Sequence, residues 1–177
     1  REHGRPLAPP GALVARLVRA LPFALTSAQE RVWSEIRSDL ARTVPMNRLL
    51  QGDVGSGKTI VAVMALMTAV EAGCQALLMA PTEILAEQHY LTLRRLLARC
   101  AYRVELLSAA VKGQERKQAL ARVASGEAQI VVGTHALIQE GVELPKLGLA
   151  VIDEQHRFGV HQRALLTRGG GERAPDV

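Results

Sequence analysis

Aromatic residues are scarce in this sequence: one Trp, two Tyr and two Phe amount to 3% of 177 residues, although 48% of the residues are hydrophobic. The core must therefore be built mainly from Ala, Val, Leu and Ile, a composition that suits a parallel sheet buried on both faces. The same scarcity argues against recognition of nucleic-acid bases by stacking on aromatic rings.

Cysteine is also rare, and Cys74 and Cys100 have no second Cys or His at metal-ligand spacing. We interpret both as reduced core thiols, which indicates a cytosolic compartment. No apolar run approaches the roughly 18 residues that a membrane span needs, and no basic-then-apolar leader of the secretory type is present. We therefore expect no membrane partner.

Acidic residues are outnumbered, so the formal net charge is +5. Most of the excess lies in residues 1–48, where eight Arg face four acids. A basic balance favours a polyanionic partner such as DNA, although a solvated basic face explains the charge equally well. If DNA binds, its phosphates are the expected contact.

The chain is organised as alternating strand and helix patterns. Residues 1–11 are predicted to be a Pro- and Gly-rich linker, and residues 166–177, which contain a Gly triplet, a flexible tail. We expect helices at 12–21, from about Thr26, and at 58–72, 83–99, 113–125 and 135–140, with strands at 49–50, 76–80, 104–107, 130–132 and 149–152. Gly73 and Gly126 are predicted C-terminal caps and Thr82 an N-cap. This alternation predicts a doubly wound α/β fold with a mostly parallel sheet.

One segment between a predicted strand and a predicted helix fits the pattern G-x-x-x-x-G-K-[ST]. In such a loop, backbone N–H groups and the positive helix N-terminus face a phosphate chain, Lys58 places a cation on it, and Thr59 can ligate Mg²⁺. An ordinary glycine-rich turn is the alternative, and this spacing disfavours it. The predicted ATP-binding residues here are Gly52, Asp53, Val54, Gly55, Ser56, Gly57, Lys58 and Thr59.

A second segment, about 95 residues after Lys58, is an apolar strand that runs into Asp153 and Glu154. Open α/β sheets bind ligands at the carboxyl ends of their strands. We expect Asp153 to hold Mg²⁺, and Glu154 to orient and deprotonate the attacking water. A charged strand terminus is the alternative interpretation of these two residues.

Asp153–His156 resembles the DExH box of superfamily 2 helicases, and the longer run to Arg163 is similar to that of their DNA branch-migration members. Residues 21–29, 80–89 and 132–138 resemble, in turn, the Q-type nucleotide motif, motif Ia and the following DNA-contacting motif. The likeness covers about residues 12–165. It implies the first RecA-like, ATP-binding domain of a helicase. A transcription-repair coupling translocase is the nearest rival, which Ser56 and Gln155 disfavour.

Further roles follow from the resemblance. Phe23 and Gln29 would bind adenine, and His156 would couple the ATP site to DNA or to a partner domain. For Gln29 a structural alternative stays open, because Thr26-x-x-Gln29 also fits a helix capping box. The box could equally form one residue later, between Ser27 and Glu30. The predicted DNA-phosphate contacts are Thr82, Thr134 and His135, for which plain helix capping is the alternative.

The resemblance also implies partners that the 177 residues do not supply: a second RecA-like domain with an arginine finger, a wedge domain and branched or forked DNA. It implies work in the bacterial cytoplasm, on nucleoid DNA. We expect this stretch alone to be nearly inactive, and to lack the strand that follows the DExH box. A non-hydrolysing nucleotide- or DNA-binding module, a P-loop kinase and a transporter ATPase are the rival functions.

Overall fold

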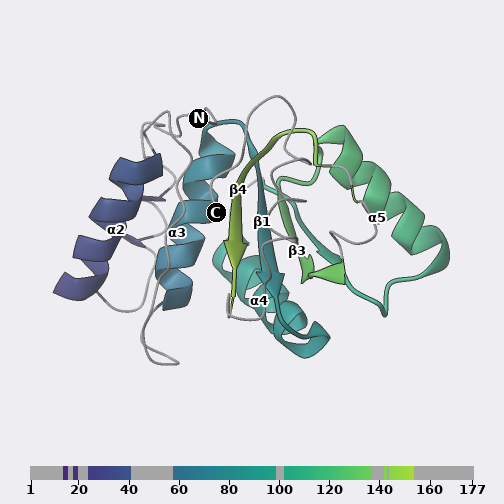
Figure 1. The fold of residues 1–177 in the computed structure, drawn as a ribbon, viewed down its shortest axis with the longest axis horizontal. Helices are drawn as coiled ribbons and strands as arrows, with labels where there is room; N and C mark the ends of the chain where they lie inside the picture. The colour runs from purple at the N-terminus through teal and green to yellow at the C-terminus, as the bar shows by residue number, and fades with distance from the viewer. Residues whose placement is uncertain are drawn as a thin grey trace.

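The sheet has four parallel strands in the order β2-β3-β1-β4 (Figure 1). The structure is a computed structural model, and it describes residues 14–15, 18–19, 24–40, 58–98, 102–136, 142 and 144–153. The strands are β1 (Gln75–Ala80), β2 (Val104–Leu107), β3 (Ile130–Thr134) and β4 (Leu147–Ile152). Four of the five predicted strands are thereby confirmed, and the fifth, at 49–50, lies outside the described residues.

Helices cover both faces of this sheet, as its composition predicts. They are α2 (Ser27–Leu40), α3 (Lys58–Glu71), α4 (Glu83–Leu96) and α5 (Gly113–Ser125). Leu78 of β1 packs in one cluster with α3 and α4, and α2 packs on the outside of α3, whereas Leu77 packs with α5 on the opposite face. All six residues of β1 are buried. The expected doubly wound α/β architecture is confirmed.

Both predicted glycine caps are present. Gly73 has φ 84°, and the bonds Gly73 N–H to Val70 carbonyl (3.0 Å) and Cys74 N–H to Ala69 carbonyl (3.0 Å) complete a Schellman motif after α3. Gly126 ends α5 in the left-handed conformation with φ 83°. Because α3 ends only four residues before β1 begins, its C-terminus lies at the amino edge of the sheet.

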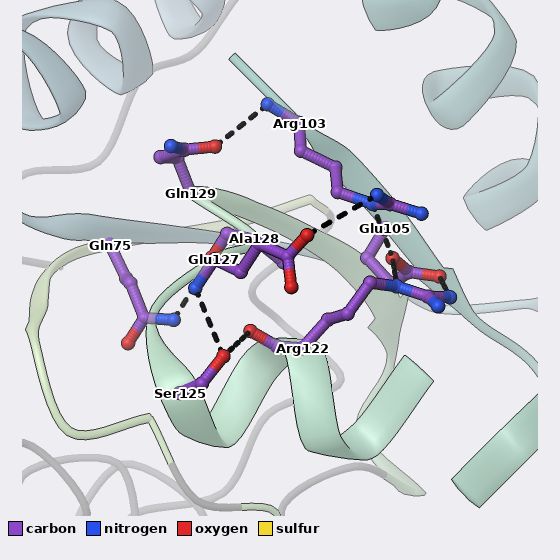
Figure 2. Close-up of polar contacts among 8 residues, drawn as sticks. All are labelled: Gln75, Arg103, Glu105, Arg122, Ser125, Glu127, Ala128 and Gln129. Atoms are coloured by element: carbon purple, nitrogen blue, oxygen red, sulfur yellow. Dashed lines mark hydrogen bonds and ion pairs between the residues drawn. The ribbon is translucent and has the colours of Figure 1, made fainter. Parts of the chain in front are cut away.

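Polar side chains tie β2 to α5 near the amino edge of the sheet (Figure 2). Arg122 of α5 makes two bonds to Glu105 of β2, at 2.8 and 2.9 Å, and Arg103 approaches the same carboxylate at 3.4 Å. Burial raises the pKa of Glu105, but the hydrogen bonds and charge of Arg122, together with the charge of Arg103, outweigh it and hold that pKa below its ordinary value. The Glu105–Arg122 pair therefore holds α5 against β2 at this edge of the sheet.

Several sequence predictions fall outside the described residues. These are the borders at residues 11 and 165, the remainder of the 12–21 helix beyond its helical residues 14–15 and 18–19, and the expected lack of a strand after the DExH box. Within the described residues, β4 pairs with β1 alone. None of the described helices is long and apolar enough to cross a membrane.

Candidate active site

The carboxyl edge of the sheet gathers three of the predicted site residues. Ala80 of β1 pairs with Thr134 of β3, and Met79 pairs with Ile152 of β4, so these strands end side by side. Thr82 follows β1 by two residues and Asp153 follows β4 directly. The ladder therefore brings Thr82, Thr134 and Asp153, which lie far apart in the sequence, to one edge.

Asp153 is held at this edge by its backbone and by its side chain. Its N–H donates to the carbonyl of Met79 at 2.8 Å, which extends the β1–β4 ladder by one residue. Its Oδ2 lies 2.9 Å from Nε2 of His89 on α4, and the two side chains are 33% and 20% exposed. The predicted metal ligand is thus partly accessible, and it contacts a histidine that the sequence analysis did not single out.

The N-terminus of α3 lies at the same edge. The helix packs along β1 and β4, and its C-terminus lies at the amino edge, so its N-terminus lies toward the carboxyl edge (Figure 1). A helix N-terminus carries roughly half a positive charge and offers unpaired N–H groups to an anion. The predicted helix start at Lys58 is confirmed, whereas the side chains of Lys58 and Thr59 and residues 52–57 lie outside the described part.

Gln29 takes part in a capping box at the start of α2. The N–H of Thr26 donates to Oε1 of Gln29 at 2.8 Å, and the N–H of Gln29 donates to Oγ1 of Thr26 at 3.1 Å. The alternative box between Ser27 and Glu30 is wrong, because the N–H of Glu30 instead makes the first helical bond, to the carbonyl of Thr26 at 2.9 Å. The adenine contact of Gln29 stays a prediction, and Gln29 must combine it with capping.

The three residues predicted to contact DNA differ in accessibility. Thr82 is exposed and caps α4, as predicted, since its Oγ1 accepts from Leu85 N–H at 3.2 Å. Thr134 is only 6% exposed, and its hydroxyl makes a long contact of 3.5 Å to Glu83 of α4. His135 is exposed. A phosphate is therefore accommodated more readily at Thr82 than at Thr134.

Glu83 is a site residue that the sequence did not single out. Its Oε2 accepts from Ala109 N–H at 3.2 Å and its Oε1 contacts Thr134, so the first turn of α4 is tied to the chain after β2 and to the end of β3. Its position beside the cap Thr82, at the carboxyl edge, is the signal that could have found it. Phe23, Glu154 and His156 lie outside the described residues.

Comparison with known proteins gives one consistent family. Residues 26–169 match the DEAD/DEAH box helicase family. The ATP-dependent DNA helicase RecG of Streptococcus pneumoniae is 54% identical over 158 residues, 89% of this chain and 23% of that protein. RecG of Bacillus subtilis is 54% identical over 162 residues, 92% of this chain and 24% of that protein. The chain thus spans about a quarter of the length of these curated relatives.

Solved structures of helicases have the same fold as this chain. The structure of RecG bound to a three-way DNA junction superimposes with a TM-score of 0.88 at 44% identity, over 98% of this chain and 23% of that chain. A hypothetical ATP-dependent RNA helicase from Sulfolobus tokodaii has a TM-score of 0.65 at 20% identity, over 92% of this chain and 48% of that chain. The second likeness shows the fold alone.

Proposed function

This chain belongs to the DEAD/DEAH box helicase family, and we propose that it is the first RecA-like domain of an ATP-driven DNA helicase of the RecG kind. The observation that carries the proposal is that the N-terminus of α3 and Asp153 both lie at the carboxyl edge of the sheet. A helix that begins at Lys58, beside a strand that is followed directly by Asp153, is the arrangement that an NTPase site requires. The RecG relatives named above support the choice of motor.

ATP binding is assigned to residues 52–59, with Phe23 and Gln29 at the adenine. In this proposal, backbone N–H groups of the loop and the N-terminus of α3 hold the phosphates, and Lys58 adds a cation at the β- and γ-phosphates. Oε1 of Gln29 accepts from Thr26 N–H, so in this proposal the same amide both caps α2 and contacts the adenine.

Mg²⁺ is assigned to Asp153 and Thr59. Mg²⁺ favours one or two protein oxygens together with substrate phosphates, so it does not need a cluster of carboxylates. No group of three or more His, Cys, Asp or Glu side chains that could hold a metal occurs among the described residues, which is consistent with that sparse mode. The carboxylate of Asp153 is partly exposed and keeps lone pairs on Oδ1. When bound, the ion neutralises charge on the phosphates, while Glu154 orients and deprotonates water and His156 links the site to its surroundings.

DNA is assigned to the carboxyl edge near Thr82, Thr134 and His135, through phosphates of a branched or forked substrate. The whole protein would supply the second RecA-like domain, whose arginine finger in NTPases raises the rate by roughly 10³–10⁵, and a wedge domain for the branch. It would act in the bacterial cytoplasm. A transcription-repair coupling translocase is less well supported, because the relatives named above are RecG proteins.

Two substitutions in the full-length protein test this function. Lys58→Ala should abolish measurable ATP and ADP binding with an unchanged melting temperature, because the phosphates lose their cation. Glu154→Gln should retain ATP binding and lose DNA-stimulated hydrolysis. Lys112→Ala, at the exposed N-cap of α5, is the matched control for Lys58→Ala and should bind nucleotide like the parent. Equal nucleotide titrations for Lys58→Ala and the parent would refute the ATP site. A parent that binds ATP without hydrolysing it on any DNA would instead favour the non-hydrolysing module.

A further inference from the structure

His89 contacts the predicted Mg²⁺ ligand across 64 positions of sequence. Its Nε2 lies 2.9 Å from Oδ2 of Asp153. An ionised carboxylate only accepts hydrogen bonds, so Nε2 must carry the proton and donate it. Both side chains are partly buried, at 20% and 33% exposure, where water competes for the bond less than it does on an open surface.

The position of His89 on α4 is well fixed. Ala86 and Leu93, one turn before and one turn after it on the same face, are 0% and 1% exposed. The N-terminus of α4 is capped by Thr82, and Glu83 ties it to Ala109. A side chain on a helix anchored in this way holds its partner within a narrow range of positions.

The β1–α4 unit contacts both the backbone and the side chain of Asp153. Met79 of β1 accepts from the Asp153 backbone, and His89 of α4, the next helix along the chain, binds the carboxylate. The backbone bond fixes the strand end but leaves rotation about the side-chain bonds. The bond to His89 removes that rotation and leaves the lone pairs of Oδ1 for another partner.

We propose that His89 is a positioning residue that orients the Asp153 carboxylate for the Mg²⁺ of a bound nucleotide. This inference rests on the proposed function, because it takes Asp153 as the ligand of that ion. Carboxylates that ligate metals need hydrogen-bond partners behind them, and the loss of such a partner typically costs roughly 10–100-fold in metal affinity or activity. A residue on α4, outside the glycine-rich loop and the DExH box, thus belongs to the nucleotide site.

The test uses the full-length protein and three substitutions at this position. His89→Ala removes the donor, His89→Leu removes the donor but fills the space, and His89→Gln keeps an N–H near the position of Nε2. Thr92→Ala is the control, because Thr92 lies on the same helix and, among the residues that the structure describes, its hydroxyl bonds only the Gln88 carbonyl of that helix, at 2.9 Å. All four should melt cooperatively near the parent.

The first measurement is binding of a fluorescent ADP analogue as Mg²⁺ is added to an EDTA-treated sample. Without Mg²⁺ all variants should bind alike. The Mg²⁺ concentration that gives half of the increase in affinity for the ADP analogue should rise roughly 10-fold or more in His89→Ala and His89→Leu. It should return most of the way to the parent value in His89→Gln and stay unchanged in Thr92→Ala. The second measurement, the Mg²⁺ concentration for half-maximal DNA-stimulated hydrolysis, should follow the same order.

The outcomes separate this inference from the proposed function. If Lys58→Ala abolishes nucleotide binding while His89→Ala and His89→Leu respond to Mg²⁺ like the parent, the function stands and the role of His89 is disproved. A His89→Gln variant as impaired as His89→Leu would also overturn it, since a donor would then make no difference. If the parent itself binds no nucleotide, both proposals fall. If His89→Ala does not fold, His89→Leu and His89→Gln alone decide.

Discussion

Thr26 and Gln29 cap the first turn of α2 reciprocally, each backbone N–H donating to the side chain of the other at 2.8 and 3.1 Å. Two donors that no helical carbonyl can reach are satisfied in this way. The bond also fixes the carbonyl end of the Gln29 amide. The residue predicted to recognise adenine is therefore held by the start of its own helix.

Gln29→Glu should separate capping from base recognition. A glutamate keeps the oxygen that accepts from Thr26 and is favoured near a helix N-terminus, but it cannot donate to N7 of adenine as an amide does. We expect unchanged stability and a preference for ATP over GTP reduced by roughly 10-fold, since a bidentate contact with adenine is worth about 1–3 kcal/mol. Gln29→Ala should lose the preference and also about 0.5 kcal/mol of unfolding free energy. Competition binding and urea denaturation measure the two effects, and an undiminished ATP preference in Gln29→Glu would contradict the adenine contact.

Much of the fold could be predicted because its signals are local. The helix Gly113–Ser125 has the predicted bounds, since Gly126 provides the left-handed residue that ends it. The order β2-β3-β1-β4 could not be predicted in the same way. It depends on pairing between distant strands, such as Ala76 with Ile130 and Leu149, and several orders would bury the same apolar runs.

In the candidate site, too, residues with a local sequence signal could be predicted and contacts between distant residues could not. Asp153 and Thr82 were identifiable because each directly follows an apolar strand or precedes a helix. The contacts of His89 with Asp153 and of Glu83 with Thr134 were not, because they join residues 64 and 51 positions apart. The capping box at Gln29 could be recognised as an alternative but not chosen, since two overlapping patterns compete for one helix start.

Gln75 should be among the most sensitive positions for stability. It is 1% exposed, its Nε2 donates to the carbonyls of Val123 and Ala128 at 2.8 and 2.9 Å, and its Oε1 accepts from Lys146 N–H at 3.1 Å. Gln75→Leu fills a similar volume but removes all three bonds, and each buried polar group left unpaired costs about 1–3 kcal/mol.

We expect Gln75→Leu to lower the unfolding free energy by about 3 kcal/mol or more in urea denaturation, on the basis of these three lost bonds. Gln129→Leu is the matched control, because the Gln129 side chain makes one exposed bond, to Arg103 N–H at 2.7 Å. It should cost about 1 kcal/mol. Equal losses in the two variants would show that water reaches the groups around Gln75.

Glu105 should make stability depend on acid pH. Its folded pKa is held below 4.5 mainly by Arg122, against the effect of burial. A carboxyl group with a lowered folded pKa binds its proton more readily when unfolded, so its stabilisation is complete above the unfolded pKa and is lost as the pH falls through the folded one. The urea midpoint should therefore decrease as the pH falls below about 4.5. Glu105→Gln should flatten part of that decrease, whereas Glu115→Gln, at an exposed position of α5, should flatten it less. A parallel pH profile for Glu105→Gln and the parent would exclude the contribution.

Thr82 caps α4 and is predicted to contact a DNA phosphate, and a substitution can separate the two roles. Its Oγ1 accepts from Leu85 N–H, and because a hydroxyl also donates one proton, it can still reach a phosphate. Asp is as good an N-cap as Ser or Thr, and its charge is favourable at a helix N-terminus. The same charge repels DNA.

Thr82→Asp should therefore keep the stability of the protein and weaken its binding to DNA. Contacts that are mostly to phosphates release counterions, so the parent should bind with little sequence preference and lose affinity steeply as salt rises. We expect Thr82→Asp to reduce affinity about 10-fold at low salt, and the difference to shrink at moderate salt as the added charge is screened. Gln114→Glu adds the same charge at an exposed position of α5, on the opposite face of the sheet from α4, and should change affinity much less. Fluorescence anisotropy with forked DNA at several salt concentrations measures the affinity of the parent and of both variants.

If Thr82→Asp and Gln114→Glu weaken binding equally, the effect is one of net charge and Thr82 does not touch the phosphates. A parent affinity that does not change with salt would count against phosphate contacts altogether.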